Sequence, residues 1–97
     1  MTQYEIALPL IDEDTYQFSI SVILPSATFE CVFRWLNSVW VLFVTFPDGS
    51  IREAGVYPNV VSWKDFPDYQ VVFTTDYTSI GRLDIGAIKM FMLDVVA

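Results

Sequence analysis

Few residues in the sequence are of the types that perform catalysis or bind metals, and their spacing favours neither activity. Histidine is absent, which excludes histidine-based triads and removes the commonest metal ligand. The single cysteine, Cys31, can form neither an internal disulfide nor a structural zinc site, and inside an apolar run it is expected to act as a small hydrophobic side chain. The acidic run Asp12-Glu13-Asp14 lacks the glycine and the spaced ligands of a calcium loop, so we interpret it as a solvated loop. We therefore expect no metal, no other cofactor and no enzymatic activity.

One catalytic alternative remains open. Asp76 and Asp84 would suit a paired-carboxylate hydrolase if they flanked a cleft, although such enzymes usually need a larger scaffold to enclose a sugar. The glycines are too scattered to cradle a phosphate and are interpreted as turn residues: Gly49, Gly55, Gly81 and Gly86. An enzyme of this kind would show a pH-dependent activity that a single Asp→Asn change abolishes.

Four aromatic residues lie in or beside predicted loops and are the candidate binding residues. They are Trp63, Phe66, Tyr69 and Tyr77. Exposed aromatic side chains can stack on sugars or anchor a protein partner, but packing over the end of the fold is the stronger expectation for all four. If they do bind, a protein interface is favoured; the alternative is a small β-barrel module in which loop aromatics hold a peptide or a carbohydrate.

The elements that would position these side chains are organised around residues 29–56. Alternate residues from Phe29 to Trp35 are apolar and would share one face of a strand. Residues 39–46 are apolar on both alternations, which predicts a strand covered on both faces. The run Pro47-Asp48-Gly49-Ser50 is typical of a tight turn. We expect an antiparallel hairpin or meander at the centre of the domain.

The rest of the chain also indicates strands. Further strands are predicted at residues 3–10, 16–24, 51–57, 69–75 and 87–96, with a loop at 76–86. Residues 59–68 are interpreted as an irregular segment or one helical turn capped by Ser62. Arg34, with Glu30 four residues earlier on the polar face of its strand, is expected to be part of an ordinary surface or cross-strand pair. The prediction is a single all-β domain over residues 1–97, a small antiparallel β-sandwich or partly open barrel of about seven strands with little or no helix.

The amino-acid composition indicates which kinds of molecule the protein can bind. Of the residues, 54% are apolar and 16% aromatic, but only 18% are charged. A small domain cannot readily bury so many apolar side chains in its own core. We therefore expect the protein to assemble as a homo-oligomer or with other proteins. A net charge of −7 and a pI near 4.1 repel nucleic acids and anionic lipids. The start MTQYEIALPL does not look like a signal peptide, and no apolar run has the length of a membrane helix, so a cytoplasmic protein is expected.

Several stretches occur in an order that points to a known family. They are YEIALPL (4–10), QFSISVIL (17–24), TFECVFRWLNSVWVLFVTFPDGS (28–50), AGVYPNVVSWKDF (54–66), YQVVFTTD (69–76) and DIGAIKMFML (84–93). Together they resemble the baseplate plug family of contractile-tailed phages, with Ile85-Gly86 where members usually have Leu-Gly. The resemblance implies a non-enzymatic structural protein of the virion tail baseplate, assembled in the host cytoplasm. Such a protein would plug or bridge the central hub and the tail-tube end, contacting copies of itself and the hub, tube and other baseplate proteins. No catalytic residues follow from it.

Overall fold

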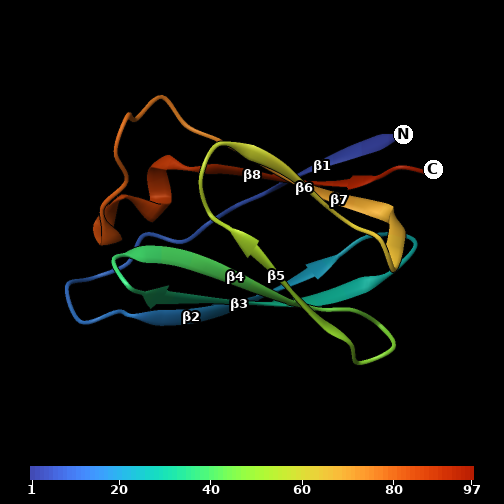
Figure 1. Ribbon diagram of the computed structural model, residues 1–97, viewed down its shortest axis with the longest axis horizontal. Helices are drawn as coiled ribbons and strands as arrows, with labels where there is room; N and C mark the ends of the chain where they lie inside the picture. Colours follow the sequence, from blue (N-terminus) through green and yellow to red (C-terminus); the bar gives the residue numbers. More distant parts are fainter.

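The protein folds as two four-stranded antiparallel β-sheets packed face to face, as seen in a computed structural model that describes residues 1–97 (Figure 1). One sheet has the order β1-β8-β7-β6 and is called the terminal sheet; the other has the order β2-β3-β4-β5 and is called the middle sheet. The elements are β1 (Thr2–Ile6), β2 (Gln17–Ile23), β3 (Thr28–Leu36), β4 (Val39–Thr45), β5 (Ile51–Gly55), β6 (Asn59–Trp63), β7 (Phe66–Thr74), the 3-10 helix η1 (Arg82–Ala87) and β8 (Lys89–Asp94). The predicted all-β sandwich is confirmed; the sheets do not close into a barrel, and there are eight strands rather than about seven.

The two chain ends meet in the terminal sheet. The chain starts there with β1, builds the whole middle sheet as a meander, and returns through β6, β7 and β8. Because β8 pairs with both β7 and β1, the termini lie side by side (Figure 1), and the Thr2 hydroxyl donates a hydrogen bond to the Ala97 carbonyl at 3.0 Å. The edge strand β1 is thereby tied to the last residues of the chain.

Two tight turns shape the middle sheet. Asn37 and Ser38 both have positive φ, 51° and 67°, as a two-residue hairpin turn that follows the twist of its strands requires. In the next turn Gly49 has φ of 89°, and the Phe46 N–H donates to the Ser50 carbonyl at 2.8 Å. The predicted hairpin around Pro47-Asp48-Gly49-Ser50 is therefore confirmed.

The prediction for residues 59–68 is wrong, because this segment forms β6 and the start of β7. The two strands join through a two-residue turn at Lys64-Asp65, with Trp63 opposite Phe66. The register shifts after Ser62, which leaves Pro67 in a bulge where its missing N–H breaks no ladder bond. This hairpin supplies the strand that the sequence analysis does not count.

Other element boundaries differ less. β1 ends at Ile6, before Pro9, and β5 ends at Gly55 rather than at residue 57. The predicted loop at 76–86 is a loop only as far as Gly81, because η1 begins at Arg82. The remaining predicted strands are present.

The core lies between the sheets and is rich in aromatic side chains. Phe29, Cys31 and Phe33 are fully buried, as their alternation predicts. Phe46 lies edge to face with Phe29, with ring centroids 5.4 Å apart. Burial, and next the neighbouring Glu30 carboxylate, raise the pKa of the Cys31 thiol to about 12. The thiol is therefore neutral near pH 7 and packs as a small hydrophobic side chain, as expected.

Candidate protein-interaction surfaces

Three of the four predicted interface aromatics pack against phenylalanines of the core, Trp63 buried and Phe66 and Tyr69 half-buried. Phe66 stacks on Phe46, with centroids 3.8 Å apart and 11° between the rings. The Trp63 ring meets the same phenylalanine edge to face at 5.3 Å, and its indole N–H donates to the Glu53 carbonyl at 3.1 Å. Tyr69 meets Phe29 edge to face at 4.9 Å. These side chains close one end of the sandwich over the Phe29–Phe46 pair, which was the stronger expectation for them.

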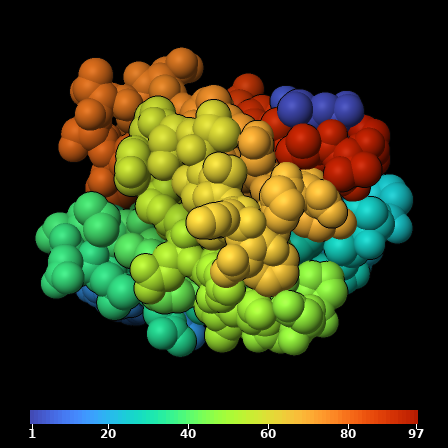
Figure 2. All heavy atoms as spheres, turned by 45° about the vertical axis from the view of Figure 1, so that its right-hand side comes forward, coloured from blue at the N-terminus to red at the C-terminus, as the bar shows by residue number.

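Tyr77 lies elsewhere and is 51% exposed in the loop before η1. It lines a hollow of about 360 Å³ with Tyr57, which is 58% exposed and which the sequence analysis does not single out. Figure 2 shows the loop of residues 76–81 (orange) and the β3–β4 turn (green) as two lobes beside the yellow-green β5–β6 connection. A Cβ at Gly55 would lie 2.3 Å from Tyr57 Cε1, so this glycine leaves room for the tyrosine ring. The signal that could have found Tyr57 is therefore the glycine two residues before it.

The outer face of the middle sheet carries an apolar row. In β4 the residues Trp40, Leu42 and Val44 are buried, but Val41 and Phe43 on the opposite alternation are half-buried and Val39 is 54% exposed. The prediction that both faces of this strand are covered is wrong, because the middle sheet has a second layer on one side only. The register adds residues of β3 to the same face, so the middle-sheet outer face consists of Val32, Arg34, Leu36, Val39, Val41 and Phe43.

Charges flank this row. The Arg34 guanidinium carbon lies 5.2 Å from the centroid of the Phe43 ring. Arg34 is exposed, as expected of a surface residue, but Glu30 accepts the Ser21 hydroxyl at 2.8 Å and no ion pair joins Arg34 to Glu30. Residues four apart on a strand are separated by about 13 Å, which is too far for direct contact. The single ion pair of the protein joins Arg52 and Asp65 at 2.9 Å.

The terminal sheet has a comparable outer row. Val60 of β6, Val72 of β7 and Phe91 of β8 lie opposite one another across three strands. They alternate with core residues, and Val60 is 61% exposed while the other two are half-buried. These three residues are called the terminal-sheet outer row. An antiparallel sheet with one face on the core usually presents polar residues on the other, so both sheets of this protein depart from the common pattern.

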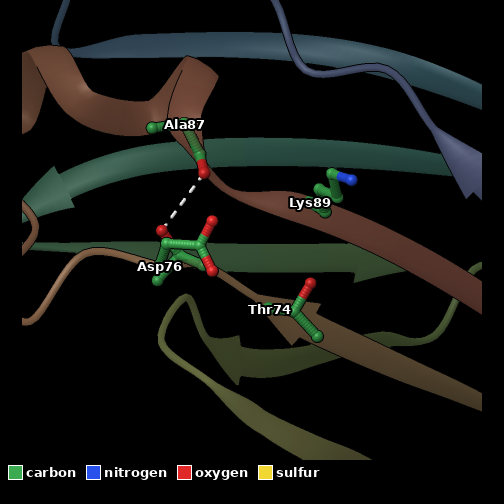
Figure 3. A pocket seen from close by; sticks show the side chains of 5 residues that line it. Thr74, Asp76, Ala87 and Lys89 are labelled. Carbon is green, nitrogen blue, oxygen red and sulfur yellow. Dashed lines mark hydrogen bonds between the residues drawn. The ribbon is translucent and has the colours of Figure 1, made fainter.

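No constellation of reactive groups accompanies these surfaces. A small pocket of about 170 Å³ is lined by Thr74, Thr75, Asp76, Ala87 and Lys89. Within it the Thr75 hydroxyl donates to the Ala87 carbonyl at 3.1 Å (dashed line in Figure 3). Asp84 does not line it; its carboxylate accepts the Gly81 N–H at 2.7 Å. Neither pocket is lined by both Asp76 and Asp84. No group of three or more Cys, Asp or Glu side chains lies together as a metal site would require.

The acidic segment at residues 12–14 is a loop, as predicted, and Arg82 fixes it from across the chain. The Arg82 guanidinium donates to the carbonyls of Asp12, at 3.2 Å, and Thr15, at 2.6 Å, and lies 4.1 Å from the centroid of the Tyr16 ring. The Asp12 carboxylate accepts hydrogen bonds from the Thr15 hydroxyl and the Asp14 N–H, which lower the pKa of Asp12. The loop at residues 12–14, near the N-terminus, is therefore held against η1, near the C-terminus.

No protein-family model, curated protein or solved structure matches this chain. The helical part of the structure is one short 3-10 segment, and no helix has the length and apolar character needed to cross a membrane.

Proposed function

We propose that the protein is a non-enzymatic structural subunit of a larger protein assembly, and that this assembly is the baseplate of a contractile phage tail. One observation carries the first part of the proposal: both outer faces of the sandwich present apolar residues across their central strands. A subunit with two such faces can bury apolar surface against a neighbour on each side, and the desolvated centre of a protein interface is built from side chains of this kind.

The baseplate is the specific assembly that the sequence resemblance supports. The resembling stretches contribute to all eight strands, so the resemblance extends over the whole fold. In this role the subunit plugs or bridges the hub and the tail-tube end, is assembled in the host cytoplasm and ends in the virion. Its net charge of −7 and the lack of a clustered reactive site are compatible with a part that contacts proteins rather than nucleic acid.

Co-expression with the products of the neighbouring tail genes tests the proposal. We expect the wild-type protein to copurify with a hub or tube protein, and Val72→Lys to lose that partner because it places a charge in the terminal-sheet outer row. Thr74→Lys is the matched control, since Thr74 lies on the same face of β7 but is exposed and outside the row. Melting temperatures of both variants must stay close to wild type. The proposal fails if no tail protein is retained by the wild type.

A binding module is the second candidate, and the tyrosine hollow favours it. Trp63 and Phe66 pack against Phe46, so of the aromatics first considered Tyr77 is the one that faces a hollow, together with Tyr57. Hydroxyl groups of Ser38, Thr78 and Ser79 line the same hollow, as a carbohydrate or peptide site would require. A monomer that binds an oligosaccharide, and loses it in Tyr77→Ala, would favour this function over the structural one.

A further inference from the structure

We propose that the middle-sheet outer face binds a second copy of this chain in a twofold dimer. Three consecutive outward positions of β3 carry the argument: Glu30, Val32 and Arg34. They place a negative charge, an apolar side chain and a positive charge in line along one strand. Val32 lies opposite Phe43, so the apolar centre continues onto β4.

This order of charges is complementary to itself. In a twofold dimer each contact occurs twice, because residue i meets residue j and residue j meets residue i. An axis lying in the interface along the Val32–Phe43 row would reverse the strand direction of the second copy. Arg34 of each copy then lies opposite Glu30 of the other, and Val32 and Phe43 meet their counterparts on the axis. Glu53 of β5, which is exposed and lies opposite Phe43, meets its own copy at the edge of the face, so one like-charge contact opposes the two Arg34–Glu30 pairs.

The free protein leaves both charged groups available for such contacts. Arg34 and Glu30 are exposed, neither takes part in an ion pair, and the hydrogen bond to the Glu30 side chain comes from the hydroxyl of Ser21, which is also exposed. A different partner protein would need a positive charge opposite Glu30 and a negative charge opposite Arg34. A second copy of this chain provides both charges in these places because of the twofold symmetry.

The area of the middle-sheet outer face indicates how tightly the dimer should bind. Four strands about 4.8 Å apart and about seven residues long make a face of roughly 20 by 24 Å. This is roughly 450 to 500 Å² per copy, below the about 800 Å² per partner of a standard interface, so the dimer is expected in the micromolar range or weaker. The inference rests on the proposed function in one respect, because it names a second copy as one neighbour of the subunit.

Charge reversal at the two positions tests the dimer. Analytical ultracentrifugation of the full chain is expected to show a shift with concentration from 11.1 kDa toward twice that mass. Arg34→Glu and Glu30→Arg each place like charges opposite one another at both ends of the interface, and each should weaken self-association by about tenfold or more. Both sites are exposed, so far-UV circular dichroism and melting temperature should not change.

Mixing the two variants is the decisive measurement. In a mixed dimer, the new carboxylate at position 34 faces the new guanidinium at position 30, and the native Glu30 faces the native Arg34. An equimolar mixture should therefore dimerise although each variant alone stays monomeric, and the double variant R34E/E30R should dimerise with itself. Lys89→Glu and Glu5→Arg match the two charge changes but lie on the terminal sheet, so they should dimerise like the wild type.

Three results would overturn the inference. The wild type could remain a monomer at millimolar concentration, the single variants could dimerise as well as the wild type, or the mixture could stay monomeric. If the wild type is a monomer and holds a hub or tube protein through this face, the first of these results applies and the face belongs to that protein. The Val72→Lys experiment is independent of all these outcomes, so the assembly proposal can stand when the dimer fails.

Discussion

At the scale of single residues, Asp94 joins the two sheets. It is 4% exposed, and one carboxylate oxygen accepts the Ser26 hydroxyl at 2.6 Å while the other accepts the backbone N–H groups of Val96 and Ala97. Tyr69 completes the network by donating its hydroxyl to Ser26 at 2.9 Å. Ser26 lies in the β2–β3 turn of the middle sheet and the other partners belong to the terminal sheet or its last residues, so this network spans the sandwich and fixes the C-terminus.

Replacing Asp94 should cost the protein more stability, relative to the wild type, at neutral pH than at low pH. The Ser26 hydroxyl, followed by the Ala97 N–H, holds the pKa of Asp94 below its ordinary value of 3.8, although burial acts to raise it. A lowered pKa means that the ionised carboxylate stabilises the fold fully above pH 3.8, and that this contribution is lost as the pH falls through the lower folded-state pKa. Asp94→Asn should therefore lower the urea midpoint at pH 7, and the difference from wild type should shrink toward pH 2.

Asp68→Asn is the control for this prediction. Asp68 is exposed and its side chain forms no hydrogen bond, so the variant should follow the wild type at every pH. If Asp94→Asn lowers the urea midpoint by the same amount at pH 7 and at pH 2, the charge of Asp94 plays no part in stability and only its shape is needed.

At the scale of elements, the β4–β5 hairpin depends on the backbone of one glycine. Gly49 has φ of 89°, in the region that L side chains adopt at a cost of about 1–2 kcal/mol, and no atom lies within 4 Å of where its Cβ would be. The cost of a side chain at this position is therefore the cost of the backbone conformation alone.

Gly49→Ala should lower the free energy of unfolding by about 1–2 kcal/mol, measured by urea unfolding with an unchanged m-value. Gly49→Asn is the matched comparison, because asparagine adopts positive φ more readily than alanine. Its free energy of unfolding should fall less than that of Gly49→Ala. If alanine and asparagine prove equally tolerated, the turn does not hold its positive φ in solution.

At the scale of the whole molecule, Phe46 connects the two sheets through its rings. It follows β4 directly and meets Phe29 of β3, Trp63 of β6 and Phe66 of β7. A residue shared in this way makes the stability of each sheet depend on the other.

Phe46→Ala should therefore destabilise the entire domain by about 3–5 kcal/mol, a large share of the about 5–15 kcal/mol of a typical domain. Circular dichroism and tryptophan fluorescence should shift together to lower urea, since unfolding is expected to remain two-state. Phe91→Ala is the control, because that ring lies on the terminal-sheet outer row rather than in the core. Separate transitions for the two probes would contradict a core shared by both sheets.

Local patterns in the sequence were sufficient for most of the elements. The alternation in residues 17–23 and 28–36 predicts strands because a period of two puts one set of side chains on one face. The glycine turn after Phe46 was equally readable. The β6–β7 hairpin was not, because its Lys64-Asp65 turn carries no glycine or asparagine and Pro67 looks like a strand breaker until the bulge accommodates it.

The candidate site was less predictable, and for a physical reason. Trp63 and Phe66 lie near loops in the sequence, but only the packing of the two sheets places Phe46 beneath them. Likewise, Arg82 reaches Thr15 across 67 positions of the chain, a contact that no local pattern contains.

The sequence by itself determined most of the strands, the main turns of the middle sheet and the all-β class, because these depend on neighbours along the chain. Only the tertiary structure decided which apolar side of β4 is core and which is surface. Both alternating sets of side chains in that strand are apolar, so the sequence does not indicate which set faces the core. The terminal sheet covers only one face of the middle sheet and leaves Val41 and Phe43 on the other face. Burial depends on which sheet packs against which, and that is a property of the whole fold.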